Sequence, residues 1–390
     1  MRARVGGQAL LILIVMVAIA AMLLVYGSTS EVGRAVKADA KTRAALDYAR
    51  QALMGRAIGD ANRPGSLPCP DLDDDGSAEL FVGSACPSYI GRLPWRTLGV
   101  GDLRDEAGER LWYALSPGFR DHPTAPPINS DAQGTLTVYS GSDALAITQE
   151  AVAVVFAPGP ALPGQIRDDN PAQCTNTGKH VPRNRCAANY LDGAANLANT
   201  AAAGPYIASL PSSHFNDKLS VIGTPDFLPL VEQRVALEVR NALLAYRSTS
   251  ACACYPWADG GADGSSETGT SRGRIPVSAA SPQAWRTGTL PAYFAPNQWA
   301  RVLYYAVARD ALENGGRGCS TCADASLSID GASGYDVVLL TTGYATGPKR
   351  STWTDYIDDA ENRNDDDRYA TPLGYSAARD RLYAIRARSR

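Results

Sequence analysis

The chain has few of the residues from which enzymes build active sites. Its 390 residues include only three histidines, His122, His180 and His214, and none lies at metal-ligand spacing from another. It also lacks a GxSxG nucleophile elbow, an HExxH helix and a phosphate-binding glycine-rich loop. We therefore expect a protein that is not an enzyme. A hydrolase site built from Ser, His and Asp residues far apart in the sequence remains an alternative, because such triads are recognised by their geometry and not by a sequence motif.

An excess of positive charge is also absent. The net charge is -3, whereas binding to a nucleic acid backbone needs a concentrated basic surface. Charges do cluster in an acidic run at 358–367 and a basic run at 379–390, which we interpret as solvated faces. The sequence therefore predicts no nucleic acid partner.

Eight cysteines, an even number, occur mostly as close pairs, which favours disulfides in an oxidising compartment. Short loops close at low entropic cost, so we expect a local bridge in each of the first two pairs. The last two pairs could instead hold zinc through four thiolates, although disulfides are favoured, and the CSTC at 319–322 also fits the letters of a redox motif. The pairs are Cys69 with Cys86, Cys174 with Cys186, Cys252 with Cys254, and Cys319 with Cys322.

An acidic turn follows the first cysteine, in the stretch LPCPDLDDDG at 67–76. The alternate carboxylates of Asp71, Asp73 and Asp75 match the first half of a calcium loop, in which hard oxygen ligands surround the ion. The twelfth loop position is Val82 and not the usual glutamate, but Glu79 is close enough to supply a carboxylate. Calcium held by these four acidic residues and an ion-free solvated turn are the two hypotheses for this stretch.

The longest uncharged run lies near the N-terminus, at residues 9–26. As a helix it would be about 27 Å long, enough to cross a hydrocarbon core. Arg2 and Arg4 precede it and the polar bulk follows, which predicts a single-pass segment with the bulk exported. A cleaved secretory signal is the alternative, although the run is long for one.

The leader MRARVGG followed by QAL resembles the prepilin-type leader of type IV pilins and type II secretion pseudopilins. The resemblance implies cleavage between Gly7 and Gln8 by a prepilin peptidase, partnership with other pilins or pseudopilins, and location in a bacterial inner membrane with the bulk in the periplasm or at a filament tip. Most pilins have a glutamate at the fifth mature position, where this chain has Ile12. That difference favours a minor, tip-proximal subunit of the K type, and a Tad-type component remains an alternative. Pseudopilin heads often bind calcium, which supports calcium as a cofactor.

Six sequence blocks recur in the same order in the two halves of the exported part. RQALMG, CPDLDDDG, GRLP, RLWYALSP, EAVAVVFAPG and NYLDGAAN in the first half match RNALLA, CYPWADGGADG, GRIP, RVLYYAVA, YDVVLLTTG and DYIDDAEN in the second. The shared order indicates an internal duplication. Asp259 and Asp263 occupy the second copy of the acidic turn. Because AVAVVFA is continuously apolar, we expect a strand that is covered on both faces, with a helix on one of them.

The fold predicted from these patterns is α+β: a long N-terminal membrane-spanning helix followed by two tandem pilin-like units, each a helix on an antiparallel sheet. The predicted boundaries are a leader at 1–7, the helix at 8–59, a first unit at 60–200, a linker at 201–223, a second unit at 224–370 and a basic tail at 371–390. The predicted function is that of a minor pilin or pseudopilin that initiates or caps a filament or contacts cargo. The alternative is a membrane-anchored periplasmic binding module that does not polymerise.

Overall fold

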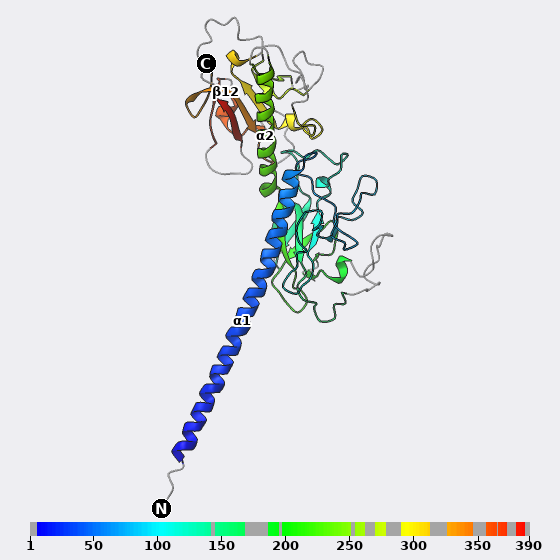
Figure 1. Ribbon diagram of the computed structural model, residues 1–390, viewed down its shortest axis with the longest axis vertical. Coiled ribbons are helices and arrows are strands. Elements are labelled where there is room, and N and C mark those ends of the chain that lie inside the picture. The colour runs from blue at the N-terminus through cyan, green and yellow to red at the C-terminus, as the bar shows by residue number, and fades with distance from the viewer. Residues whose placement is uncertain are drawn as a thin grey trace, which may run out of the picture.

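The computed structural model describes most of the chain as one long helix and two sheet-containing units (Figure 1). Up to residue 32, the structure describes the side chains of Met16 and Val17 only. The described ranges are 6–141, 145–167, 186–194, 197–250, 254–261, 270–277, 290–312, 326–345, 356–364, 366–372 and 380–386.

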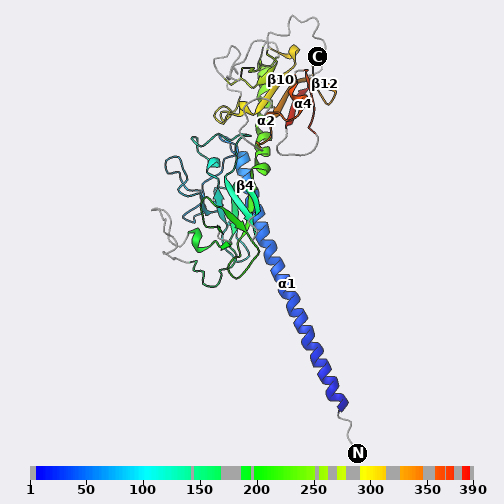
Figure 2. The same ribbon diagram turned by 180° about the vertical axis from the view of Figure 1, so that it is seen from behind.

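Helix α1 (Gly6–Gly59) packs on the first sheet with its C-terminal part only. Its buried side chains Leu46, Ala49, Leu53 and Ala57 recur at three- and four-residue spacing, so they form one stripe along the helix. Figure 1 and Figure 2 both show the rest of α1 projecting away from the sheets. Thr42 is the first buried side chain among those described, and its hydroxyl accepts a hydrogen bond from the Glu106 amide.

The first sheet lies against α1 and has six strands. Along the hydrogen-bonded order they are β1 (Ile90–Arg92), β2 (Trp112–Leu115), β4 (Leu145–Ala157), β3 (Leu136–Ser140) and β7 (Tyr206–Ala208), with β8 (Lys218–Gly223) also paired to β4. All pairs are antiparallel except β3 with β7, which is parallel. Short elements between them are η1 (Pro117–Phe119), η3 (Ala187–Asn189) and the ribbon of β5 (Gly193–Ala194) and β6 (Leu197–Ala198).

The second sheet follows α2 (Thr224–Thr249) and also has six strands. Their order is β9 (Arg272–Arg274), β10 (Leu303–Val307), β12 (Ala332–Thr341), β11 (Leu327–Ile329) and β13 (Arg368–Tyr369), with β14 (Arg381–Arg386) also paired to β12. The pairing of β11 with β13 is parallel and the others are antiparallel. Further short helices among the described residues are η4 (Trp299–Arg301), η5 (Arg309–Ala311) and α4 (Ala360–Arg363).

The two sheets have the same topology, strand for strand. Each has a long central strand with the same neighbours, a parallel partner at the far edge, and a last strand that pairs with the central one. The six repeated sequence blocks thus belong to two units of one design. We call α1 and the first sheet the first unit, and α2 and the second sheet the second unit.

Contacts between helix and sheet recur at matching positions of the two units. Arg50 in α1 donates a hydrogen bond from Nε to the carbonyl of Val221 in β8, over 3.1 Å. Arg240 in α2 donates in the same way to Ala384 in β14, also over 3.1 Å. These arginines begin the blocks RQALMG and RNALLA, so the sequence repeat marks the point at which each helix is tied to the last strand of its sheet.

The strand predicted from AVAVVFA is β4, and residues 151–157 are all buried. Val152 and Val155 belong to the core that includes α1, whereas Val154 and Phe156 pack with Tyr190 on the opposite face. The expected double coverage is confirmed. The second cover is the segment around η3 and not another helix.

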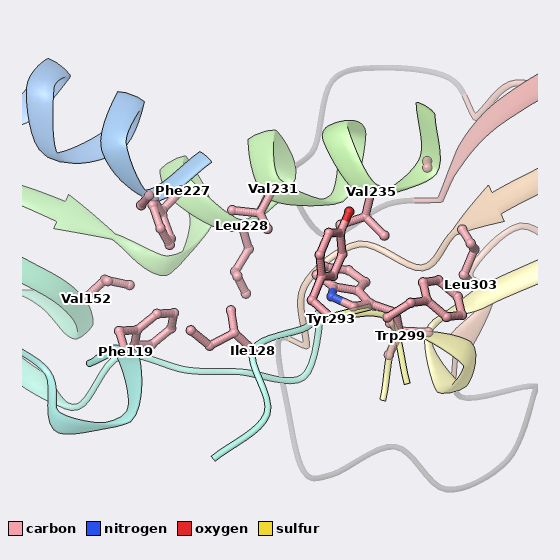
Figure 3. Packing of buried hydrophobic residues seen from close by; sticks show 14 of the residues in the cluster. Phe119, Ile128, Val152, Phe227, Leu228, Val231, Val235, Tyr293, Trp299 and Leu303 are labelled. Atoms are coloured by element: carbon pink, nitrogen blue, oxygen red, sulfur yellow. The ribbon is translucent and has the colours of Figure 1, made fainter. Parts of the chain in front are cut away.

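A single hydrophobic core joins the two units, as Figure 3 shows. The N-terminal turns of α2 supply Phe227, Leu228 and Val231, which are fully buried and lie between Phe119 and Ile128 of the first unit and the residues of the second. Thr224, the first residue of α2, does not cap the helix with its side chain. The N-cap is Gly223, and the Thr224 hydroxyl donates to the Glu150 carbonyl over 2.7 Å.

The fold-class prediction is wrong in its membrane-spanning component. Among the helices of the described residues, none is both long and apolar enough to cross a bilayer. The transmembrane segment predicted at 9–26 is therefore contradicted, together with the single-pass inner-membrane location. The prediction used only the apolar, uncharged character of residues 9–26, most of whose side chains lie outside the described set. The buried side chains of α1 begin at Thr42 and pack on the first sheet.

The expected pair of pilin-like antiparallel units is also corrected. Each sheet contains a parallel pair, and the two units share one core instead of following each other as separate tandem units. In addition, β7 and β8 lie in the segment predicted as a linker at 201–223, and β14 lies in the predicted basic tail at 371–390. The pairing partners of these strands are far away in the sequence, so no local pattern specifies their place in the sheets.

Candidate functional site

The acidic turn lies between α1 and β1 and is held at both ends. The disulfide between Cys69 and Cys86, predicted from the sequence, is present with the two Cα atoms 5.6 Å apart. Next to it, Asp71 and Arg92 exchange backbone hydrogen bonds of 3.0 and 2.7 Å. The turn is therefore anchored to the first sheet at the residue where the acidic sequence begins.

Three carboxylates gather in this turn. One oxygen from each of Asp71, Asp73 and Glu79 lies within 4.8 Å of the other two. Asp71 is almost fully buried, whereas Asp73 is exposed. The Glu79 carboxylate also accepts a hydrogen bond from the Leu72 amide over 3.0 Å, which brings it back to the start of the turn.

Asp75, the fourth residue predicted as a ligand, is not part of this group. Its carboxylate accepts a hydrogen bond of 2.6 Å from the Ser77 amide, and this bond is the main reason why the pKa of Asp75 is lowered. Alternation along the sequence placed Asp75 with the others. In the structure Asp74 has a left-handed backbone, with φ of 64°, so the alternation expected of an extended segment does not hold.

Burial of Asp71 makes its negative charge unfavourable. Desolvation is the largest effect and raises the pKa of Asp71 to about 6, and the charges of Asp73 and Asp74 act in the same direction. Hydrogen bonds from the amides of Asp74 and Gly76, of 2.7 and 2.8 Å, oppose this rise. A cation bound by the three carboxylates would favour the ionised form.

Sequence reasoning missed the basic side chains beside the turn. Arg110 lies 2.8 Å from an Asp74 carboxylate oxygen, and Arg92 lies 3.9 Å from the same atom. Arg92 is buried between the rings of Trp112 and Tyr190, at 4.3 and 4.1 Å from their centroids. No local sequence signal joins these residues, because Arg92 lies in β1, Arg110 just before β2 and Tyr190 just after η3. They neutralise Asp74 and leave the other three carboxylates for a cation.

The donor set fits calcium in its chemistry. Calcium takes hard oxygen ligands, and carboxylates are its common protein ligands. Asp71, Asp73 and Glu79 would hold the ion, and its charge would offset the repulsion between their carboxylates. Gly76, with φ of +87°, permits this compact turn, since a Cβ there would lie 2.4 Å from the Trp95 ring.

The second unit does not repeat the group. Asp259 exchanges backbone hydrogen bonds with Arg274 just as Asp71 does with Arg92, so it occupies the equivalent position. Asp263 lies outside the described residues. Cys69 lies two residues before Asp71 in the first unit. The residue at the same distance before Asp259 in the second unit is Trp257.

The other cysteine predictions are tested only in part. Cys186 and Cys254 are disulfide-bonded, so Cys254 is not available as a thiolate for the alternative zinc site. Cys174, Cys252, Cys319 and Cys322 lie outside the described residues. The pairings proposed for these cysteines stay predictions.

The predicted processing site is at the beginning of α1. Gly7 and Gln8 lie in its first turn, and their side chains are outside the described set. Cleavage between them stays a prediction.

The sequence matches no protein-family model, and neither a curated protein nor a solved structure is significantly similar to it.

Proposed function

We propose that this protein is a minor structural subunit of a pilin-type filament, which assembles through α1 and presents the two sheet units as a recognition head. The observation that carries the proposal is the projection of α1 from the head (Figures 1 and 2). The proposal concerns assembly between copies and does not require α1 to cross a membrane.

The length of α1 supports this role. At 1.5 Å per residue its 54 residues extend about 81 Å, and the buried stripe on the first sheet begins only at Thr42. Helices in proteins gain most of their stability from packing of a face. Met16, Val17 and Val36, on the projecting part, are each more than half exposed apolar side chains. Packing between α1 helices of neighbouring copies would bury them.

The two units are joined closely enough for the head to bear force or to bind a partner as one body. Besides the shared core, polar contacts join the units: Asn129 donates from Nδ2 to the Asn297 carbonyl over 2.8 Å, and Gln133 donates to the Ala345 carbonyl over 3.0 Å. A tip-proximal subunit would need such a rigid head, since it contacts cargo or initiates assembly.

Calcium bound by Asp71, Asp73 and Glu79 is part of the proposal as a structural cofactor of the first unit. It would hold the acidic turn and the loop up to Cys86 in one conformation.

Site-specific photo-cross-linking in cells tests the assembly contact. A photoreactive amino acid at Val36 should give covalent products between copies or with other filament subunits. The same residue at Leu210, which is 85% exposed on the first unit, is the matched control and should give none of these products. Mass spectrometry of the mature protein should in addition find an N-terminus at Gln8.

A protein that forms no Val36 cross-links and keeps Met1 would contradict the filament proposal. It would then favour the alternative of a binding module that does not polymerise.

A further inference from the structure

Each unit has an aspartate immediately before its last strand. Asp217 precedes β8 in the first unit, and Asp380 precedes β14 in the second. Both are almost fully buried, and both accept backbone hydrogen bonds from the segment that crosses the outer face of the sheet. The duplication thus provides two versions of one contact that can be compared.

The surroundings confirm that the two positions are equivalent. In the first unit, the Asn199 side chain both donates to and accepts from the backbone of Ile207, eight residues later. In the second, Asn362 makes the same pair of bonds with Ala370, again eight residues later. The aspartates therefore belong to the same arrangement of loop, parallel strand and last strand.

In the first unit the contact is reciprocal. The Asp192 amide donates to Oδ2 of Asp217 over 2.8 Å, and the Asn216 amide donates to Oδ2 of Asp192 over 2.9 Å. Asn199 adds a bond of 3.0 Å to Oδ2 of Asp217. We call this reciprocal pair the Asp192–Asp217 clamp. It ties residues 187–194 and Asn199 to the beginning of β8.

The clamp places two buried carboxylates together and leaves one oxygen without a partner. Asp217 is 3% exposed, and its Oδ1 makes no hydrogen bond to any described residue. Both oxygens of Asp192 are occupied, since Gln165 donates to Oδ1 over 3.1 Å. A buried, unpaired carboxylate oxygen is costly if the group is charged and much less so if it carries a proton.

The second unit satisfies its aspartate differently. Asp380 accepts the Asp358 amide with one oxygen and the Asp359 amide with the other, over 3.0 and 3.2 Å. Asp358, which corresponds to Asp192, is exposed to solvent. The second unit therefore has no reciprocal buried pair, and it is an internal control for the first.

The charged groups that surround the clamp leave a negative excess. Arg167 is the cation that acts on both carboxylates, but it also lies 3.0 Å from Glu109 and donates to the Gly159 carbonyl over 2.7 Å. Gly159 donates in turn to the buried Asp105 carboxylate over 2.8 Å. Lys218, next to Asp217, is bound to two further carboxylates: Glu106 and Asp39, at 3.0 and 3.1 Å.

We propose that the Asp192–Asp217 clamp is a proton-controlled latch, which holds residues 187–194 and Asn199 against β8 while Asp217 is protonated and loosens when both carboxylates are ionised. The proposal is independent of filament assembly. The released proton goes to solvent, and no other group needs to change its chemical state.

The electrostatics of the buried pair agree with this assignment. Desolvation first, and then the neighbouring Asp192 charge, raise the pKa of Asp217 to about 7. The folded protein therefore binds this proton more tightly than the unfolded chain does. The stabilisation that it gives is present at low pH and is lost as the pH rises toward the folded-state pKa.

Hydrogen exchange followed by mass spectrometry tests the latch. In the wild type, the protection of peptides from 187–194 and 216–223, corrected for intrinsic amide exchange, should fall roughly tenfold or more between about pH 5 and pH 8. Asp217→Asn should remove this pH dependence, because its side chain cannot ionise. Asp192→Asn should reduce it, because the neighbouring charge is gone. Asp380→Asn, the matched control in the second unit, should leave it unchanged.

If the corrected protection of the wild-type peptides did not change with pH, this result would overturn the proposal, and no variant would be needed. So would a pH dependence that persists in Asp217→Asn, or one that is removed equally by Asp380→Asn. The wild-type measurement keeps the test decisive even if a variant does not fold.

Discussion

The ring of Phe227, at the beginning of α2, packs edge-on against the ring of Phe119 in the first unit, with centroids 5.9 Å apart. Phe227 thus belongs to the helix of one unit and lies in the core of the other (Figure 3). The contact explains why the units are not separate: the first turns of the second helix complete the core of the first unit.

Replacing this ring should destabilise both units together. We expect Phe227→Ala to lower the free energy of unfolding by about 3–5 kcal/mol, the usual range for a buried phenylalanine. Chemical denaturation followed by fluorescence measures the loss. Leu237→Ala, at a 41% exposed position of the same helix, should change it by about 0.5 kcal/mol or less. A Phe227→Ala protein as stable as the Leu237→Ala control would show that the shared core is not energetically important.

Calcium should stabilise the first unit. Chelation should lower the Tm of the wild type, measured by differential scanning calorimetry, and added calcium should restore it. The double variant Asp73→Asn, Glu79→Gln should have a Tm that does not respond to either treatment. Asp75→Asn is the matched control, because Asp75 lies outside the carboxylate group, and it should respond as the wild type does. Equal wild-type melting with and without chelator would refute the site.

Loss of the first disulfide should weaken the same region. Cys69 and Cys86 are 17 residues apart, and closing a loop of this length in the unfolded chain stabilises a protein by about 3 kcal/mol in the chain-entropy description. We expect the Cys69→Ala, Cys86→Ala double variant to lose about that amount in a denaturant titration. A change below about 0.5 kcal/mol would mean that the native contacts alone hold the turn.

The stability of the calcium-free protein should depend on pH through Asp71. Its folded-state pKa of about 6 lies above the ordinary value of about 3.9 for an unfolded aspartate. The folded state therefore binds the proton more tightly, and stability should fall as the pH rises between these values. Denaturation in chelator at several pH values measures the slope, which should be shallower in Asp71→Asn. Saturating calcium should also make it shallower, since the ion favours the carboxylate. A slope unchanged by Asp71→Asn would contradict this assignment.

Local patterns predicted some parts of this protein well. The close spacing of Cys69 and Cys86 predicted their disulfide, and the continuous apolar character of 151–157 predicted a strand that is covered on both faces. Of the four acidic residues predicted to hold calcium, three carboxylates do meet, those of Asp71, Asp73 and Glu79. Each of these features depends on residues near one another in the chain, so composition and spacing carry the information.

The remaining features depend on distant pairing. Asp75 leaves the carboxylate group because of the turn at Asp74, and Arg92 in β1 and Arg110 just before β2 reach the turn from later parts of the chain. The membrane-spanning interpretation of 9–26 depended on hydropathy along one segment, and the structure contradicts it. The hydropathy of one segment contains no information about the surface on which the rest of the helix packs.

By itself, the sequence determined the order of the repeated blocks, and with it the two matching units, because each block contains its own strand, turn or helix signal. Only the tertiary structure decided that β8 and β14 complete the sheets, that Arg50 and Arg240 tie the helices to them, and that α2 joins both units in one core. The two arginine contacts link residues more than 140 positions apart, and nothing in a local pattern specifies which distant strand a segment will pair with.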